Sequence, residues 1–176
     1  MKLLENKKIA IVIAFRDFRD PEYFIPKMNL ENNGAKITTL SSKKGIALGA
    51  DGGEAFVDEE IQKANPGDFD AVLFIGGAGM VKNLDNDDFQ EFARNAKIIG
   101  AICIAPALLA KAGILNGKKA TVWSSNMDKS AIKILKENKA IYQEVAVVTD
   151  GNIITANGPL AADKFSQAVT EVLTRD

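Results

Sequence analysis

The chain of 176 residues contains one cysteine, Cys103, in the segment GAICIAP at positions 100–106. Apolar residues before Cys103 indicate a buried strand, and Pro106 three positions later is typical of the first turn of a helix. A thiol at a helix start lies beside unpaired backbone N–H groups and the positive end of the helix dipole. Such thiols have lowered pKa values, so the pattern predicts a nucleophile elbow with a reactive thiolate. The alternative is an ordinary small buried side chain.

Two further segments contain groups that could assist this sulfur. Gly76 and Gly77 open the glycine-rich turn GGAG, whose N–H groups could hold an oxyanion together with the N–H of Ile104. Such a turn can also need glycine for conformational reasons alone. Glu22 follows the first apolar run, and when protonated it could donate a hydrogen bond to the thiolate, whereas an ionised Glu22 would raise the thiol pKa. Its alternative role is to compensate the dipole of a solvated helix.

The absence of histidine excludes several kinds of chemistry. With 0 histidines and 1 cysteine, the chain cannot assemble a Ser-His-Asp triad, a Cys-His pair or a usual zinc site. The glycine turn matches neither the dinucleotide fingerprint nor the phosphate-binding P-loop. We therefore expect no metal and no cofactor.

Composition narrows the partners and the compartment. A formal net charge of -1 and a pI near 5.6 indicate no nucleic-acid partner, and no apolar run is long enough to span a membrane. A single cysteine cannot form an intramolecular disulfide, which favours a reducing compartment and predicts a cytoplasmic protein.

Apolar runs alternate with amphipathic ones along the chain, a pattern that predicts one α/β domain over residues 1–176. The architecture expected is a doubly wound, mostly parallel sheet with helices on both faces. Asp20 is predicted to cap the first helix. The expected strands are residues 8–15, 35–40, 70–75, 97–102 and 121–123, with hairpins at 45–57 and at 145–149 with 152–155; the expected helices are residues 20–33, 58–64, 87–95, 104–112, 128–137 and 160–173.

Four other residues are candidates for lining a site at the carboxyl ends of the strands, where such sheets bind ligands. Trp123 and Tyr23 could face this crevice, although core packing is the usual role of aromatic side chains. Asn157 and Pro159 follow the last expected strand, and a turn role explains them equally well.

Taken together, these segments resemble the ThiJ/PfpI superfamily. The similarity lies in EYFIP (22–26), FIGGAGM (74–80), AICIAP (101–106), LLAKAGILNGK (108–118) and TANGP (155–159). The resemblance implies a flavodoxin-like fold, an elbow cysteine at Cys103 that is strained and prone to oxidation to sulfinic acid, and an acid partner at Glu22. It also implies that Gly77 and Ile104 supply backbone donors, and that the protein is a homodimer or a higher homo-oligomer.

The chain departs from the family pattern at two places. PfpI-type proteases have a histidine directly after the cysteine, where this chain has Ile104. The deglycase branch has one on the following strand, near the segment TVW at 121–123. Both departures argue against peptidase or amidase activity.

Three functions are open at this point. The first is an enzyme acting on α-oxoaldehydes or their adducts, as a glyoxalase or deglycase does, through Cys103 assisted by Glu22. The second is a non-catalytic redox sensor or chaperone-like stress protein whose Cys103 oxidises with peroxide. The third is an intracellular peptidase or amidase, which ranks last because the chain has no histidine. The partner expected is therefore a small reactive carbonyl or a peroxide.

Overall fold

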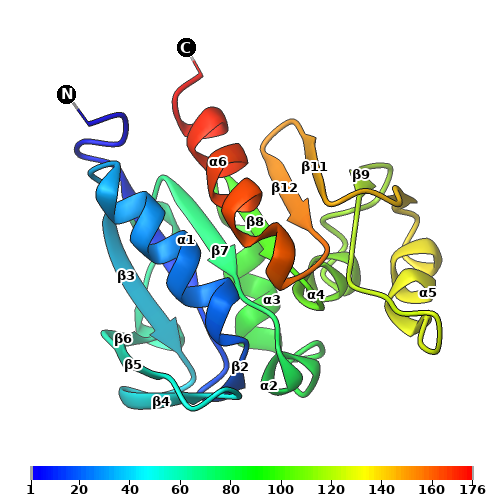
Figure 1. Cartoon of the computed structure of the whole chain (residues 1–176), viewed down its shortest axis with the longest axis horizontal. Coiled ribbons are helices and arrows are strands. Elements are labelled where there is room, and N and C mark those ends of the chain that lie inside the picture. The colour runs from blue at the N-terminus through cyan, green and yellow to red at the C-terminus, as the bar shows by residue number, and fades with distance from the viewer. Residues whose placement is uncertain (1, 176) are drawn as a thin grey trace.

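The computed structural model describes residues 2–175 and contains a central sheet of seven strands (Figure 1). Their spatial order is β11-β12-β8-β7-β1-β3-β6. The strands span Lys8–Val12 (β1), Lys36–Ser41 (β3), Glu59–Glu60 (β6), Ala71–Phe74 (β7), Ile99–Ile102 (β8), Val147–Asp150 (β11) and Ile153–Ala156 (β12).

All neighbouring strands of this sheet run parallel except β11 and β12, which form an antiparallel hairpin. Asp150 and Gly151 turn this hairpin, and Gly151 has φ 61°, a conformation that glycine adopts without steric cost. The flavodoxin-like, mostly parallel sheet predicted from the sequence is confirmed. The chain places β3 on one side of β1 and β7 on the other, so the strand order reverses at β1 and β7.

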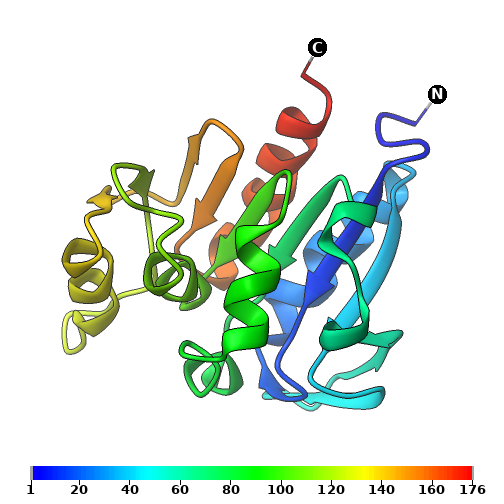
Figure 2. The ribbon, with the colours of Figure 1, turned by 180° about the vertical axis from the view of Figure 1, so that it is seen from behind.

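Helices cover both faces of the sheet. Helices α1 and α6 pack side by side on one face, and α3 and α4 lie on the other, as Figures 1 and 2 show from opposite sides. The helices span Asp20–Asn32 (α1), Ala78–Val81 (α2), Asp87–Arg94 (α3), Ala105–Lys111 (α4), Ser130–Glu137 (α5) and Ala162–Leu173 (α6), with short 3-10 turns at Ile61–Lys63, Pro66–Asp68 and Pro159–Ala161.

Strand β1 shows how the sequence builds these two layers. Ile9 and Ile11 belong to the core beneath α1 and α6, whereas Ala10 and Val12 belong to the core on the opposite face. Successive side chains of a strand point to opposite faces, so a continuous apolar run fills both cores at once. All four side chains are 0% exposed.

Two small sheets complete the fold. One consists of β2 (Arg16–Phe18), β4 (Gly45–Gly49) and β5 (Glu54–Val57), where β4 and β5 form the predicted hairpin. The other pairs β9 (Lys119–Ala120) with β10 (Ile141–Tyr142).

Three local predictions were wrong. The helix expected at 58–64 is instead strand β6 followed by a 3-10 turn, because Glu59 and Glu60 pair with the edge of β3. The strand expected at 121–123 lies in an irregular segment after β9. Asp20 was predicted to be the N-cap of the first helix, but it is the first residue of α1. The N-cap is Arg19, whose side chain makes no capping hydrogen bond.

The carboxylate of Asp20 bonds to a distant turn and not to the N–H groups of its own helix. Its oxygens accept hydrogen bonds from the backbone N–H groups of Asp51 (3.0 Å) and Gly53 (2.7 Å). These two bonds hold the turn between β4 and β5 against the start of α1. Between residues 2 and 175, no helix has the length and apolar character needed to cross a membrane.

Candidate active site

The site lies where four parallel strands end. The register aligns Val12 of β1 with Phe74 of β7, Phe74 with Ala101 of β8, and Ile102 of β8 with Ala156 of β12. The segments that follow these strands therefore emerge at the same edge of the sheet. This edge includes the point where the strand order reverses, the place at which open α/β sheets bind ligands.

Cys103 occupies the junction between β8 and α4 in a left-handed backbone conformation, with φ 65°. Its N–H donates to the carbonyl of Ala156 (2.9 Å), and its carbonyl accepts from the N–H of Trp123 (2.8 Å). A non-glycine residue in this conformation costs roughly 1–2 kcal/mol, so the two bonds offset the strain and fix the direction of the side chain. The sequence predicted the turn, but the segments that hold it are distant along the chain.

Glu22 is brought to Cys103 through the glycine turn. The Glu22 side chain is 0% exposed, in the first turn of α1. The N–H of Arg19 donates to the carbonyl of Gly76 (3.0 Å), which joins the start of α1 to the turn after β7. A side-chain carbon built on Gly76 would lie 2.6 Å from Cβ of Cys103 and 2.8 Å from Oε1 of Glu22. Gly76 therefore fills the narrow space between the thiol and the carboxyl, where only glycine fits.

The candidate backbone donors divide between these two groups. The N–H groups of Ile104 and Gly77 act on the Cys103 sulfur, and the N–H of Gly76 acts on the Glu22 carboxyl. Gly76, which the prediction grouped with the donors to the anion pocket, lies against both Cys103 and Glu22, and its N–H lowers the pKa of Glu22. Within residues 2–175, neither buried carboxyl oxygen of Glu22 has a hydrogen-bond partner of ordinary geometry.

Burial dominates the protonation of the pair. It raises the pKa of Glu22 to about 7, against lowering contributions from the Cys103 thiol, the Gly76 N–H and the Arg19 guanidinium. Burial also raises the pKa of Cys103, the charge and the carboxyl of Glu22 raise it further, and the N–H groups of Ile104 and Gly77 only partly oppose them. The lowering expected from the backbone N–H groups is therefore outweighed by burial, and the charge of an ionised Glu22 raises the thiol pKa as expected. The first proton leaves the pair from Glu22, and the resulting carboxylate lies beside a neutral thiol.

A cavity of about 320 Å³ opens onto Cys103. Its walls are mainly apolar, and they come from four separate segments. Gly77 and Cys103 line it together with the side chains of Ala78, Val81, Leu84, Ile104, Trp123 and Ile134, and its polar side chains are those of Asp128 and Ser130.

Of the four predicted lining residues, only Trp123 lines this cavity. Tyr23 is buried in the core under α1, and its hydroxyl bonds to the Thr39 hydroxyl (2.7 Å). Asn157 is exposed, and Pro159 opens a 3-10 turn. Both follow β12, and neither lines the cavity.

Several lining residues carried no signal in the sequence. Val81 and Leu84 follow the glycine turn, and Ile134 lies on α5. Each has a side chain of ordinary core type at ordinary helical spacing, so only the tertiary structure separates it from a core residue. The segment 128–137 was predicted as a helix without any role at the site.

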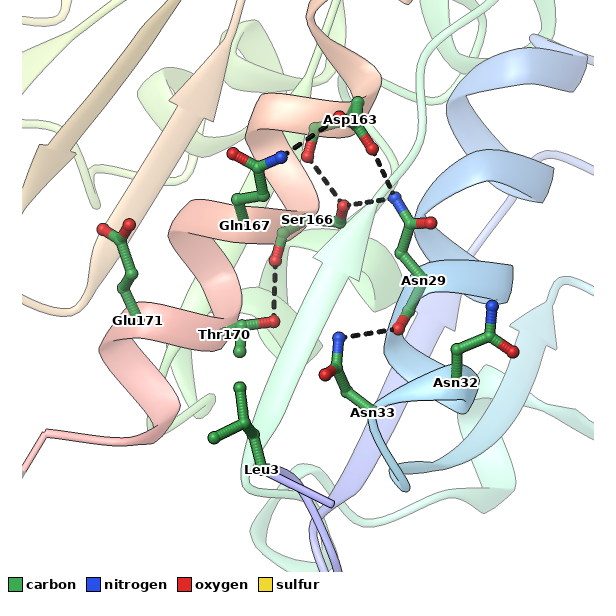
Figure 3. A pocket seen from close by; sticks show the side chains of 9 residues that line it. All are labelled: Leu3, Asn29, Asn32, Asn33, Asp163, Ser166, Gln167, Thr170 and Glu171. Carbon is green, nitrogen blue, oxygen red and sulfur yellow. Dashed lines mark hydrogen bonds between the residues drawn. The ribbon is translucent and has the colours of Figure 1, made fainter. Parts of the chain in front are cut away.

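A second cavity lies away from the cysteine, between α1 and α6 (Figure 3). The amide of Asn29 donates to the carboxylate of Asp163 (2.7 Å) and to the hydroxyl of Ser166 (2.9 Å). Figure 3 shows these polar side chains directed at one another across the two helices. Their bonds join α1 to α6, which explains this cavity as part of the helix packing.

The fold and the site define a class of protein with an α/β sheet and a cysteine elbow facing a buried acid. The DJ-1/PfpI family model matches residues 7–172, so the chain belongs to the DJ-1/PfpI family.

The similarity between this chain and known proteins extends over nearly its whole length. An uncharacterized protein of Methanocaldococcus jannaschii is 39% identical over 98% of this chain and 85% of its own. General stress protein 18 of Bacillus subtilis is 32% identical over 97% of this chain and 99% of its own. The crystal structure of a ThiJ/PfpI domain protein from Brachyspira murdochii is 31% identical, covers 96% and 97% of the two chains, and has a TM-score of 0.90.

Other relatives carry the name deglycase. They come from Pyrococcus abyssi, Escherichia coli and Pyrococcus furiosus, and are 27%, 26% and 28% identical to this chain. These names support a stress-related protein of the DJ-1/PfpI type.

Proposed function

We propose that this protein is a cysteine-dependent enzyme that converts α-oxoaldehydes such as methylglyoxal, free or as adducts, into α-hydroxy acids. The observation that carries the proposal is the left-handed Cys103, held between the buried carboxyl of Glu22 and an open cavity. The deglycase names of several relatives support the same substrate class.

The reaction begins with addition of sulfur to the aldehyde. As the C–S bond forms, the thiol proton of Cys103 passes to the carboxylate of Glu22, and the aldehyde oxygen becomes the oxyanion of a hemithioacetal. The N–H groups of Gly77 and Ile104 lower the pKa of the Cys103 thiol in the free enzyme, and in the proposed reaction they donate to the oxyanion that forms beside the sulfur.

Rearrangement and hydrolysis complete the cycle. Glu22 first passes the thiol proton to the oxyanion, which gives a neutral hemithioacetal and restores the carboxylate. The carboxylate then takes the proton from the former aldehyde carbon and returns it to the neighbouring ketone carbon, while the hydroxyl proton passes to the former ketone oxygen. The first carbon is thereby oxidised, the second is reduced, and a thioester of Cys103 results. Water then breaks the C–S bond, which releases the α-hydroxy acid and restores the thiol. The overall change adds one water and needs no oxidant or reductant.

Glu22 takes the role that histidine has in Cys-His pairs. A general base works best when its pKa lies near the working pH, and burial raises the pKa of Glu22 to about 7. A carboxyl with an ordinary pKa would be a much weaker base. The absence of histidine from the chain is therefore compatible with thiol chemistry.

Conversion of methylglyoxal to lactate by purified protein tests the proposal. We expect Cys103→Ser to abolish conversion, and Glu22→Gln to reduce kcat by about 10²–10⁴, the usual contribution of a general base. Glu144→Gln, which changes an exposed carboxylate outside the cavity, is the matched control and should leave conversion unchanged. Equal conversion by wild type and Cys103→Ser would refute the proposal.

The redox-sensor alternative is less favoured by this site. Oxidation by peroxide proceeds through the thiolate. Burial and the charge of Glu22 raise the pKa of Cys103 and so reduce the thiolate fraction. A general base beside the thiol assists addition to a carbonyl, which supports the enzymatic proposal over the sensor.

A further inference from the structure

The lining of the Cys103 cavity carries information about the substrate that the thiol and the acid do not. From this lining we infer that the cavity is an apolar subsite, which selects uncharged aldehydes with an aromatic or aliphatic substituent larger than methyl. The inference rests on the proposed function and names its preferred substrate class.

The first argument is the chemical character of the walls. Ile104, Trp123 and Ile134 contribute apolar side chains from the start of α4, from the segment after β9 and from α5. Val81 and Leu84 close the cavity from the segment that begins at α2. Among residues 2–175, no lysine or arginine lines the cavity, so no cationic side chain there would neutralise a carboxylate or a phosphate on a substrate.

The second argument concerns the polar side chains of the cavity. Asp128 accepts hydrogen bonds from the backbone N–H (2.9 Å) and the hydroxyl (2.6 Å) of Ser130, and these bonds lower its pKa. The Asp128 carboxylate is therefore ionised and already partnered. Its negative charge makes the cavity unfavourable for anions, and neither Asp128 nor Ser130 offers a free donor to a polar substituent.

The third argument is size. A volume of about 320 Å³ lies at the lower end of the range of roughly 300–1,000 Å³ for small-molecule sites. Methylglyoxal would leave most of the apolar wall wet, whereas a phenyl or longer alkyl substituent would cover it. Burying such a group against Val81 and Ile134 removes apolar surface from water in both the substrate and the protein.

Alkylation of Cys103 tests the subsite independently of catalysis. The probes are iodoacetamide, N-benzyl iodoacetamide and iodoacetate, each rate being divided by its rate with free cysteine. We expect the normalised rate for the benzyl reagent to exceed that for iodoacetamide by about tenfold, and iodoacetate to be slowest.

Two exposed valines supply matched variants. Val81 lines the cavity and is 53% exposed, whereas Val145 is 50% exposed and lies outside the lining. Val81→Asp should remove most of the benzyl preference, and Val81→Thr, which is nearly isosteric, should reduce it in part. Val145→Asp should leave it unchanged. A normalised ratio near one, or an equal effect of Val81→Asp and Val145→Asp, would overturn the subsite.

Turnover separates the subsite from the proposed function. We expect kcat/KM for phenylglyoxal, measured as mandelate formed above a Cys103→Ser blank, to exceed that for methylglyoxal by about tenfold. A benzyl preference in alkylation without turnover of either aldehyde would refute the proposed function and support the subsite. Turnover with no preference in either assay would refute the subsite alone.

Discussion

Replacement of Glu22 by glutamine should stabilise the protein, and the gain should depend on pH. Glu22 is fully buried, and burial raises its pKa from the ordinary 4.5 to about 7 in the folded chain. Between these values the folded state binds more protons than the unfolded state, so stability falls as pH rises. Below pH 4.5 the Glu22 carboxyl hardly lowers the free energy of unfolding, and above pH 7 it lowers it by the full amount.

The size of the effect follows from the two pKa values. One pKa unit corresponds to about 1.4 kcal/mol, so ionised Glu22 destabilises the fold by about 3 kcal/mol at pH 8. Glutamine has nearly the same volume and no charge. The gain of Glu22→Gln in free energy of unfolding should thus be near zero at pH 4.5 and about 3 kcal/mol at pH 8, or roughly 6–12 °C in Tm.

Urea denaturation followed by circular dichroism at several pH values from 4.5 to 8.5 measures this difference. Glu144→Gln, a substitution of an exposed glutamate, is the matched control and should show no such trend. The reasoning would be refuted by a constant difference between wild type and Glu22→Gln over this range. A gain that decreases with rising pH would refute it as well, since it would mean that ionised Glu22 stabilises the fold.

Three further predictions concern the same edge of the sheet. Alkylation of Cys103 by iodoacetamide at pH 8.5 should be about tenfold faster in Glu22→Gln than in wild type, because loss of the carboxylate lowers the thiol pKa. Turnover of methylglyoxal by the same variant should fall. If alkylation and turnover were both slower, Glu22 would stabilise the thiolate instead. Gly76→Ala should destabilise the protein by about 1–3 kcal/mol and change the alkylation rate of Cys103, since the new carbon overlaps Cβ of the cysteine; unchanged stability in urea would contradict this. Asp20→Ala should cost about 1–3 kcal/mol by leaving two backbone donors of the β4–β5 turn unpaired, and unaltered hydrogen exchange of those amides would argue against it.

The local pattern of the sequence was sufficient for most of the architecture. Apolar runs separated by amphipathic ones predicted the parallel sheet, and the Asp150-Gly151 turn predicted its antiparallel edge. Short elements escaped prediction because their stability comes from distant partners. Strand β6 has two residues and exists because it pairs with β3.

Sequence alone also determined which side chains can do chemistry in this chain: one thiol, no imidazole, and an acid that follows the first strand. Residue types and turn signals are local properties, and they are written directly in the order of residues. The tertiary structure decided the rest. Desolvation raises the pKa of Glu22 and Cys103, and burial depends on every segment packed around them. Which aliphatic side chains line the cavity, and that Tyr23 does not, depends equally on how distant segments pack together.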